Sequence, residues 1–426
     1  MDNDTHHQSQ SVIIAGLNTG DSDYDYSMVE LAELAQADGM DVVDRFDQKI
    51  DKPNPATYFG EGKVDELADT AGVGGIKTII TNDELTPSQL RNLEDETNCQ
   101  VMDRTALILD IFAKRAQTRE AKIQVEIAQL QYELPRLETA DNVRLDQQAG
   151  GGSGLNNRGA GETKLELNRR TIQQRISKLR GDLKKIQRSE STKRRRRDKS
   201  AIPTAALVGY TNSGKSTIMN GLLKMYGASD KSVMVKDMLF ATLDTSVRQL
   251  TLPDSKRFLI SDTVGFIGKL PTTLIEAFKS TLNEAANADL LVQVIDYSDP
   301  HYKEMMATTQ RTLKEIGIDD IPMINIFNKA DKTTVAYPAQ DGENSLIISA
   351  NQSASLQALA RMIRGVLFKD FVDAELLVPF SDGDVVSYLN EHTNITKTQY
   401  EANGTRLRVE MSPADYQRFQ QYVVGQ

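Results

Sequence analysis

The sequence predicts an α/β fold in four parts, and three observations lead to this fold class. Strand-like and helix-like stretches alternate over about residues 11–103 and again over about 202–368. Two apolar stripes at helical spacing lie between these regions, and the tail from residue 370 is too short for a large domain. We therefore expect a small α/β domain (1–108), a long helical hairpin (109–200), a larger α/β domain (201–369) and a small α+β module (370–426).

The first domain alternates short strands with helices. Strand-like stretches lie at residues 11–17, 40–43 and 77–81, and helix-like stretches at 28–37 and 61–71. Thr86 and Pro87 look like an N-cap and a first-turn proline that open a further helix. Such alternation predicts a sheet of parallel strands.

Two long helices are predicted next, because apolar residues recur at alternating spacings of four and three. The stripes comprise Ile123, Ile127, Leu130, Leu134 and Leu137, and then Ile172, Ile176, Leu179, Leu183 and Ile186. Such stripes are typical of a narrow packing seam and not of a ligand site. The segment from Gly150 to Gly161 is predicted to be a flexible loop that no helix would tolerate. The basic run from Lys193 to Arg197 is expected in or beside a linker, as an RNA contact or as a solubilising segment.

From about residue 202 the alternation predicts a mixed, mostly parallel sheet with helices on both faces. The tail predicts a strand (374–378), a helix (384–391), two strands (396–400 and 406–409) and a last helix (414–423).

Composition excludes several classes of protein. No apolar run approaches the roughly 20 residues that cross a bilayer, and the polar N-terminus lacks a signal-peptide pattern, so we expect a cytoplasmic protein with peripheral membrane association left open. Because Cys99 is the only cysteine, the chain cannot form an internal disulfide. With one cysteine and four histidines, a structural zinc site is not expected. The net charge of −10 hides a basic segment, since residues 111–200 carry 22 Lys/Arg against 11 Asp/Glu. This segment indicates a polyanion contact such as RNA, although a lone charge run is more often a solvated helix face.

The strongest motif follows a short apolar strand and precedes an apolar-periodic helix. It reads Gly209, Tyr210, Thr211, Asn212, Ser213, Gly214, Lys215, Ser216, Thr217 and matches G-x-x-x-x-G-K-[ST] in its required context. The glycines let backbone N–H groups converge on phosphate oxygens. Lys215 is expected to act on the β- and γ-phosphates, and the Ser216 hydroxyl to coordinate Mg²⁺.

Three further signals indicate a GTPase, and the last two of them would contact the guanine base. A strand ends in Asp262, Thr263, Val264 and Gly265, where Asp262 is expected to hold Mg²⁺ and the Gly265 N–H to sense the γ-phosphate. A later strand ends in the N-K-x-D signature Asn328, Lys329, Ala330, Asp331. The Asp331 carboxylate matches the guanine N1–H and 2-amino donors, which adenine lacks. Ser349 and Ala350 complete the expected base pocket, and the order of the motifs predicts one P-loop GTPase domain.

A mobile segment between these motifs is expected to supply a threonine to Mg²⁺ when the γ-phosphate is present. The segment includes Phe240, Ala241 and Thr242, and we predict that Thr242, rather than Thr245, binds the ion. Where many GTPases place a glutamine that orients the attacking water, this chain has Phe266. We therefore expect Lys215, Thr242 and Gly265 to support slow intrinsic hydrolysis that a partner accelerates.

The motifs together resemble the HflX family of ribosome-associated, translation-factor-type GTPases. The resemblance also covers the stretches from Tyr58 to Leu67 and Val101 to Arg115, and the Gly-rich segment through Glu162. It implies a GTP/GDP- and Mg²⁺-dependent hydrolase that binds the large ribosomal subunit in its GTP form, acts in ribosome splitting, rescue or stress, and is a monomer when free. The hairpin and the Gly150 to Gly161 loop, with Arg158, would contact ribosomal RNA.

Three alternatives accompany this interpretation. The chain would be a GTP-dependent RNA- or ribosome-binding module with little catalysis if Phe266 marks lost hydrolysis. A membrane-protease regulator has no support in the sequence, since no membrane-binding amphipathic segment stands out. Some members of the family are reported to use ATP through the N-terminal domain, and Gly60, Gly62 and Lys63 offer a weak motif for this, although a plain loop-to-helix turn is the better interpretation.

Overall fold

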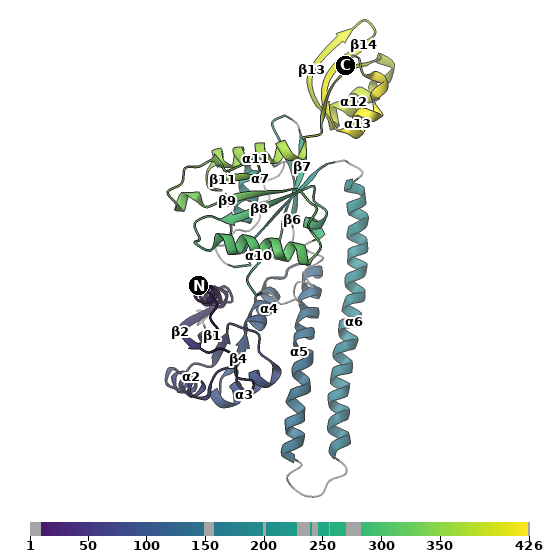
Figure 1. The fold of residues 1–426 in the computed structure, drawn as a ribbon. Coiled ribbons are helices and arrows are strands. Elements are labelled where there is room, and N and C mark those ends of the chain that lie inside the picture. The colour runs from purple at the N-terminus through teal and green to yellow at the C-terminus, as the bar shows by residue number, and fades with distance from the viewer. Residues whose placement is uncertain are drawn as a thin grey trace, which may run out of the picture. The chain divides into compact units, whose positions relative to one another are not determined.

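The computed structural model describes residues 10–148, 157–198, 202–227, 239–240, 246–254, 256–269 and 283–424 (Figure 1). The chain forms two compact units. The first comprises Met1–Arg194 with Lys236–Asp244 and Gly265–Thr281, and the second comprises Arg195–Val235, Thr245–Val264 and Leu282–Gln426. The segments that contain the predicted residues Thr242 and Gly265 thus belong to the first unit, together with the N-terminal half of the chain.

The first unit begins with a sheet of four parallel strands in the order β2-β1-β3-β4. Its elements are β1 (Gln10–Asn18), α1 (Tyr24–Ala37), β2 (Met40–Lys49), α2 (Glu61–Gly74), β3 (Thr78–Thr81), α3 (Pro87–Thr97) and β4 (Gln100–Asp103). The parallel arrangement confirms the predicted sheet. The predicted start of α3 is also confirmed, since Thr86 is the N-cap, Pro87 is the first helical residue, and Thr86 forms a capping box with Gln89. Strand β4 was not predicted, because only one of its four residues, Val101, is β-branched, whereas all four residues of β3 are.

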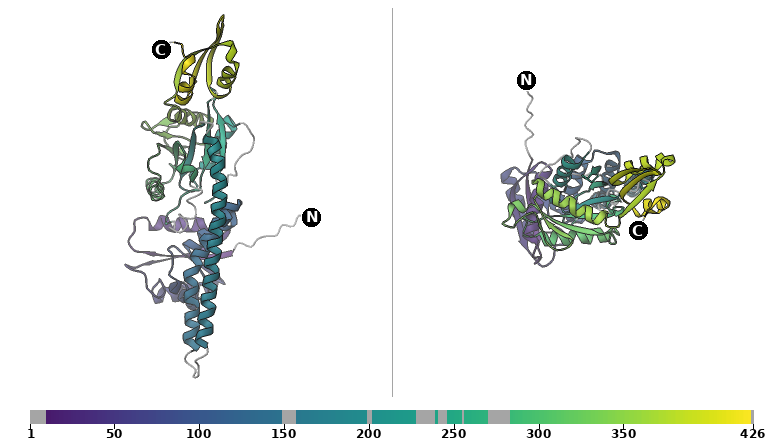
Figure 2. Two further views of the ribbon diagram at one scale, coloured as in Figure 1. Left: turned by 90° about the vertical axis from the view of Figure 1, so that its right-hand side faces the viewer. Right: turned by 90° about the horizontal axis from the view of Figure 1, so that it is seen from above.

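The hairpin predicted from the two stripes is present. After α4 (Arg104–Arg115), the helices α5 (Arg119–Gln148) and α6 (Asn157–Asp198) run side by side (Figures 1 and 2). Their seam is made by the buried residues Ile123, Ile127, Ile176 and Leu179, against which the next residues of both stripes pack. Eight of the ten stripe residues are therefore packing positions, as the spacing predicts, while Leu134 and Leu137 do not belong to this cluster.

One end of α6 differs from the prediction and the other agrees with it. Because α6 begins at Asn157, the residues from Asn157 to Gly161, including Arg158, are helical and only the preceding part of the expected loop lies outside the described residues. Each glycine costs about 1 kcal/mol in a helix, which a helix of 42 residues with a packed seam tolerates. The run from Lys193 to Arg197 lies in the last turns of α6, beside the segment that leads to β5 and not within it, because it holds no glycine or proline to end the helix earlier.

The second unit is built on seven strands in the order β10-β11-β9-β8-β5-β7-β6. Its elements are β5 (Thr204–Gly209), α7 (Lys215–Tyr226), β6 (Ser246–Thr251), β7 (Arg257–Asp262), α9 (Asn283–Ala286), β8 (Leu290–Asp296), α10 (Tyr302–Glu315), β9 (Met323–Asn328), β10 (Ala339–Gln340), β11 (Ser345–Ile347) and α11 (Ser353–Leu367). Only β6 and β10 are antiparallel to their neighbours, and Figure 1 shows α7 and α11 on one face and α10 on the other. The carboxyl ends of β5, β7, β8 and β9 therefore meet at one edge, where ligands of such sheets bind.

The tail is a three-stranded antiparallel sheet in the order β12-β14-β13. Its elements are β12 (Val372–Val378), α12 (Gly383–His392), β13 (Asn394–Glu401), β14 (Gly404–Met411) and α13 (Pro413–Arg418). Residues from both helices pack on one apolar sheet face that contains Leu376, Leu407 and Val409. The last helix is shorter than predicted, because the chain turns back after Arg418 and Val423 bridges to Leu376 at the edge of β12.

Candidate functional site

The loop between β5 and α7 carries the predicted phosphate-binding residues, and its geometry explains both glycines. Gly209 has a φ of 143° and Gly214 a φ of 97°, in the left-handed region that favours glycine. A Cβ atom on Gly209 would lie 2.2 Å from the carbonyl oxygen of Val294, and one on Gly214 would lie 2.2 Å from Nδ2 of Asn328. The loop is packed so closely against the ends of β8 and β9 that neither position has room for a side chain.

Lys215 begins α7 and lies buried beneath this loop. Its Nζ donates to the carbonyl oxygens of Gly209 at 3.0 Å and Tyr210 at 2.7 Å. Burial lowers the pKa of the Lys215 ammonium to about 8; Asp262 opposes this shift, and the Lys329 charge adds to it. A phosphate bound at the loop would favour the charged ammonium and so relieve this cost of burial.

Ser216 and Asp262 form the second part of the site. The Ser216 hydroxyl donates to Oδ2 of Asp262 at 2.7 Å. Asp262 is buried at the end of β7, opposite Leu207, and the next residue, Thr263, donates from Oγ1 to the Leu207 carbonyl at 2.7 Å. A hydroxyl and a carboxylate held together beside a phosphate loop are ligands that Mg²⁺ prefers, so these residues fit a magnesium ion.

Asn328 joins the N-K-x-D motif to the phosphate loop. Its Nδ2 donates to the Ser213 carbonyl at 2.9 Å, and its Oδ1 accepts from the Ala350 N–H at 2.9 Å. One buried amide thus ties together three segments of the chain: Ser213 is 115 residues from Asn328, and Ala350 is 22 residues from it. The arrangement indicates that phosphate loop and base loop form one preorganised pocket.

The remaining base-side residues lie beside Asn328. Ser349 is buried and its N–H donates to Oγ of Ser355 at 3.2 Å, while Asp331 is exposed in the short helical turn Ala330–Lys332. Lys329 pairs with Asp296 at 2.7 Å. The sequence analysis did not single out Asp296, because nothing in the order of residues brings the end of β8 to this motif.

Most predicted residues therefore meet within the second unit. They are Gly209, Tyr210, Thr211, Asn212, Ser213, Gly214, Lys215, Ser216, Thr217, Asp262, Thr263, Val264, Asn328, Lys329, Asp331, Ser349 and Ala350. Ala241 and Thr242, with the second choice Thr245, lie outside the described residues. Phe240 and Gly265 belong to the first unit.

Within the first unit, helix α4 contacts both of those segments. Phe240 packs edge-on against Phe112, with ring centroids 4.6 Å apart, and Arg115 donates to the Leu239 carbonyl. The buried Arg104, which pairs with Glu30, donates to the Gly268 carbonyl at 3.2 Å. Phe266 is buried, and its phenyl ring has no polar group that could orient a water molecule. These contacts were not predicted, and the arginine at each end of an apolar helix is the sequence signal that could have found them.

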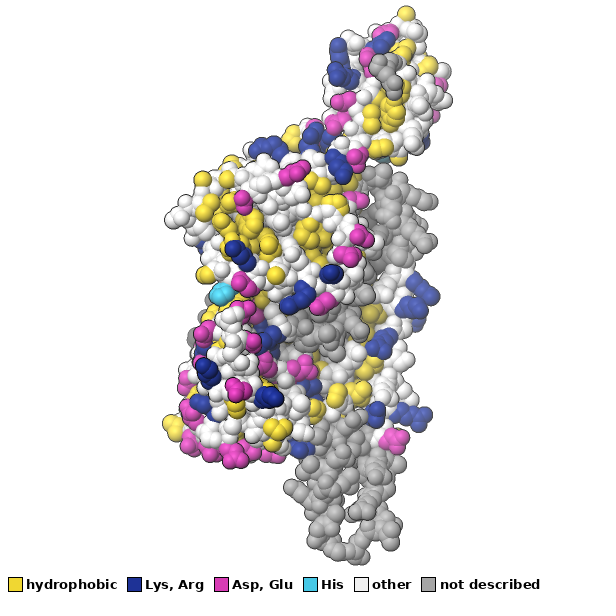
Figure 3. All heavy atoms as spheres, in the orientation of Figure 1, with side chains coloured by type: hydrophobic (Ala, Val, Ile, Leu, Met, Phe, Trp, Pro, Cys, Tyr) yellow, Lys and Arg dark blue, Asp and Glu magenta, His cyan; other side chains and the backbone are white. Residues whose placement is uncertain are grey.

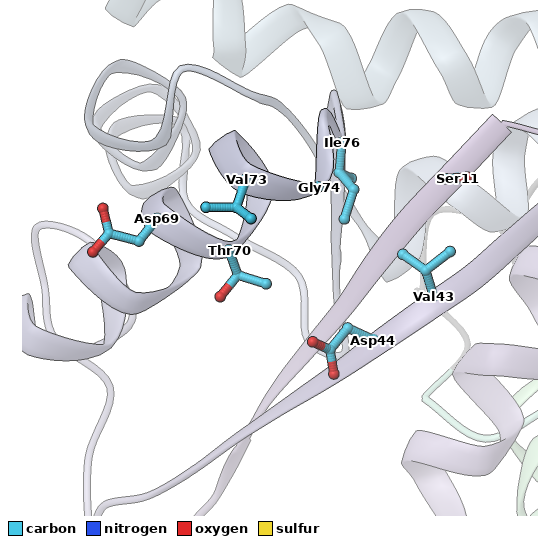
Figure 4. A pocket seen from close by; sticks show the side chains of 8 residues that line it. All are labelled: Ser11, Val43, Asp44, Asp69, Thr70, Val73, Gly74 and Ile76. Carbon is cyan, nitrogen blue, oxygen red and sulfur yellow. The ribbon is translucent and has the colours of Figure 1, made fainter.

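The weak N-terminal motif proves to be an ordinary helix start. Gly60 is the N-cap of α2, Gly62 lies in its first turn, and Lys63 pairs with Glu66 at 2.6 Å. A hollow of about 510 Å³ opens beside the other end of α2, near Val43 and Val73 (Figure 4). The charged residues that line it, Asp44 and Asp69, would repel phosphate. This geometry favours the loop-to-helix turn over an ATP site.

Basic side chains follow the exposed surface of α6. Arg169, Arg170, Arg175, Lys178, Arg180, Lys184, Lys185 and Arg188 are all exposed. Figure 3 shows Lys and Arg side chains gathered along this helix. A row of cations on one long helix matches the charge of a nucleic-acid backbone.

The mixed sheet, the phosphate loop after β5 and the base loop after β9 define a P-loop GTPase. Residues 204–329 match the domain family described as 50S ribosome-binding GTPase. Residues 25–113 and 115–197 match the families described as GTP-binding GTPase N-terminal and GTP-binding GTPase Middle Region.

Full-length relatives identify the family. A GTPase HflX of Lacrimispora saccharolytica is 40% identical over 93% of this chain and 92% of its own length. A GTPase HflX of Flavobacterium psychrophilum is 46% identical over 71% of this chain and 70% of its own length. The chain therefore belongs to the HflX family of GTPases.

A solved structure of a GTP-binding protein from Sulfolobus solfataricus in complex with GDP is similar over 84% of this chain and 99% of that chain, with 23% identity and a TM-score of 0.45. In the part of the chain that the structure describes, no helix is both long and apolar enough to cross a membrane.

Proposed function

We propose that this GTPase binds the large ribosomal subunit in its GTP-bound form and leaves it after hydrolysis, as a ribosome-splitting, rescue or stress-response factor. The observation that carries the proposal is the Asn328 junction, which joins a phosphate loop and a guanine-type loop in one pocket. The basic surface of α6 supports the ribosomal partner. The relatives named above are GTPases of the same family.

In the proposed reaction, water attacks the γ-phosphorus of GTP, the bond to the β–γ bridging oxygen breaks, and GDP and inorganic phosphate are released. Backbone N–H groups from Gly209 to Thr217 hold the phosphates, and the Lys215 ammonium stabilises charge on the β- and γ-oxygens. Ser216 and Asp262 would hold Mg²⁺, which supplies charge neutralisation at the phosphates. Thr242 and Gly265 are proposed to contact the γ-phosphate side and complete the catalytic set.

Guanine would be selected on the opposite side of the pocket. The exposed Asp331 carboxylate would accept from N1–H and the 2-amino group, and the Ala350 N–H, which donates to Asn328 Oδ1 in this structure, would donate to the O6 atom of a bound guanine. Because Asn328 is fixed to Ser213, the base and phosphate subsites keep a constant separation. Adenine would leave Asp331 without donors, which is costly in a desolvated site.

The buried Phe266 leaves the attacking water without a partner from that position. We therefore propose slow turnover by the free protein and faster turnover on the large subunit, which would supply or order the missing group. The non-catalytic alternative, a GTP-dependent ribosome-binding module, rests on the same residue. The two differ in whether the ribosome raises the rate.

The experiment that tests the proposal measures GTP hydrolysis by the purified chain, alone and with purified large ribosomal subunits, at low and high salt. Salt-sensitive stimulation of at least about tenfold is expected, because basic contacts to RNA weaken as salt rises. GTP binding without stimulation would overturn the proposed activation and leave the binding module. Absence of GTP binding would overturn the nucleotide site itself.

A further inference from the structure

Lys329, in the centre of the guanine-type motif, adopts an unusual backbone conformation. Its φ is 62°, in the left-handed region that residues with a side chain rarely adopt. Such a conformation persists only when the surrounding structure holds it. The next residues, Ala330–Lys332, form a tight turn in which the Lys332 N–H donates to the Lys329 carbonyl at 3.0 Å. The direction of Asp331 in this turn thus depends on the conformation of Lys329.

Asp296 is the residue that holds the Lys329 side chain. Its Oδ2 lies 2.7 Å from Lys329 Nζ, and both side chains are only 17% exposed. Asp296 ends β8 directly opposite Asn328 on the parallel strand β9. The register of the sheet therefore sets the point to which the Lys329 side chain is drawn.

Asp296 is itself held in one orientation. Its Oδ1 accepts from the Ser298 N–H at 3.0 Å and from the Ser298 hydroxyl at 2.6 Å. The intervening Tyr297 donates its N–H to the Asn328 carbonyl at 2.8 Å. With both carboxylate oxygens engaged, Asp296 presents a fixed anchor and not a mobile surface charge.

The far side of Lys329 is also fixed. Asn328 is bound to Ser213 and Ala350, and the Ala330 N–H donates to the Ile348 carbonyl at 3.0 Å. Among the described residues, the side chain of Asp331 has no hydrogen bond of this kind to orient it. The position of the Asp331 side chain is therefore set by the turn, and the conformation of the turn is set by Lys329.

We propose that Asp296 is a positioning residue that determines guanine specificity. Through its ion pair it keeps Lys329 in the left-handed conformation and thereby aims the Asp331 carboxylate at the base. The role rests on the proposed guanine site and adds to it a residue outside the N-K-x-D motif. Asp296 touches no part of the nucleotide in this role and acts only through Lys329.

The test compares the binding of GDP and inosine diphosphate, which lacks the 2-amino group. Because only Asp331 reads that group, the ratio of the two affinities reports the aim of Asp331 and not the state of the phosphate loop. The wild-type chain is expected to prefer GDP at least about tenfold. Asp296→Ala is expected to bring the ratio toward one, with most of the loss in GDP affinity, and Asp296→Asn to lie between.

Asp299→Ala is the matched control, since Asp299 lies on the same loop and its carboxylate accepts only from the His301 N–H, at 2.8 Å, among the contacts described. It should leave the ratio unchanged. If Asp296→Ala does not fold, Ser298→Ala keeps the carboxylate and removes only the hydroxyl that orients it, and a smaller shift of the ratio in the same direction is expected.

A second measurement checks the route of the effect. In a chain that already carries Lys329→Gln, Asp296→Ala should change the GDP affinity no further, as a double-mutant cycle would show. An unchanged ratio in Asp296→Ala, or in Ser298→Ala where the alanine variant fails to fold, overturns the inference while the guanine site stands. A wild-type chain that does not distinguish the two nucleotides overturns the proposed function instead.

Discussion

At the residue scale, two glycine positions of the GTPase domain differ in what their backbone and surroundings demand, one in the phosphate loop and one after α10. Gly214 and Gly317 both have a positive φ, of 97° and 81°. A Cβ atom on Gly214 would collide with Asn328, whereas one on Gly317 would meet nothing within 4 Å. The two positions therefore separate backbone strain from loss of space.

Gly214→Ala is expected to weaken GDP binding at least about tenfold, because the new methyl group displaces the amide that joins the two loops. Gly317→Ala should cost about 1 kcal/mol of the free energy of unfolding and leave GDP binding unchanged. Calorimetric titration with GDP and thermal unfolding measure the two effects. Equal GDP affinities in the two variants would contradict the role of Gly214 as a close-packing position.

The buried Lys215 gives nucleotide binding a pH dependence. Its pKa is lowered to about 8 in the free protein from an ordinary value of 10.5. Between these values the unfolded chain binds a proton that the folded chain lacks, so the free energy of unfolding gains a contribution as pH rises through this window and loses it as pH falls toward 8. A bound phosphate favours the ammonium and reverses the shift.

Binding of GDP above about pH 8 is therefore expected to take up one proton, and the dissociation constant should rise by up to about tenfold per pH unit. Titration calorimetry in two buffers of different ionisation enthalpy measures the proton uptake, below the pH at which guanine itself titrates. Lys215→Arg serves as the comparison, because guanidinium stays protonated. Equal proton uptake by both proteins would exclude Lys215 as its source.

At the element scale, the hairpin divides its residues between packing and charge. The seam uses Ile176 and Leu179 on α6, while Arg170, Lys178 and Lys184 of the same helix are exposed. The seam stabilises the pair of helices, since helices in proteins gain most of their stability from tertiary packing. These three exposed side chains take no part in the seam and are available to contact a polyanion.

Replacing Arg170, Lys178 and Lys184 together by glutamine is expected to weaken binding to large ribosomal subunits at low salt and to leave the free energy of unfolding within about 0.5 kcal/mol. The slope of log affinity against log salt should fall by about two to three. The matched control replaces the exposed Gln173, Gln174 and Ser177 by alanine. An unchanged salt slope in the charge variant would remove α6 from the ribosomal contact.

At the scale of the whole molecule, the second unit includes a polar joint between the GTPase domain and the tail module. Lys256, at the β6–β7 turn, is buried, pairs with Glu410 on β14, and lies 5.1 Å from the ring centroid of Phe368. Arg364 bonds Asp254 at 2.6 Å on the same turn. Lys256, Glu410 and Phe368 border a cavity of about 370 Å³ between the two parts.

Glu410→Gln is expected to lower the free energy of unfolding by about 3 kcal/mol, because it leaves a buried ammonium without its main partner. The double variant Lys256→Met/Glu410→Gln should recover most of that loss, since the buried charge is then absent. Thermal unfolding of the wild type, both single variants and the double variant completes the cycle. A double variant no more stable than Glu410→Gln would show that the pair is not coupled.

Sequence alone predicted the order of the parts, the seam of the hairpin and most of the residues that the structure brings together around the loop between β5 and α7. It did so because these features are local: a helical period, a glycine pattern and motifs at the ends of strands are written in neighbouring residues. It went wrong at the start of α6 and at the end of the last helix, where packing over a long element or a sheet-edge bridge overrides local preference.

Only the tertiary structure decided which distant residues meet. Asn328 reaches Ser213 and Ala350, and Asp296 reaches Lys329, because parallel strands bring their carboxyl ends to one edge in a fixed register. The burial that lowers the Lys215 pKa is likewise a property of the folded loop. Contacts between residues far apart in the chain depend on register and burial, and these follow from the packing of whole elements and not from any local pattern.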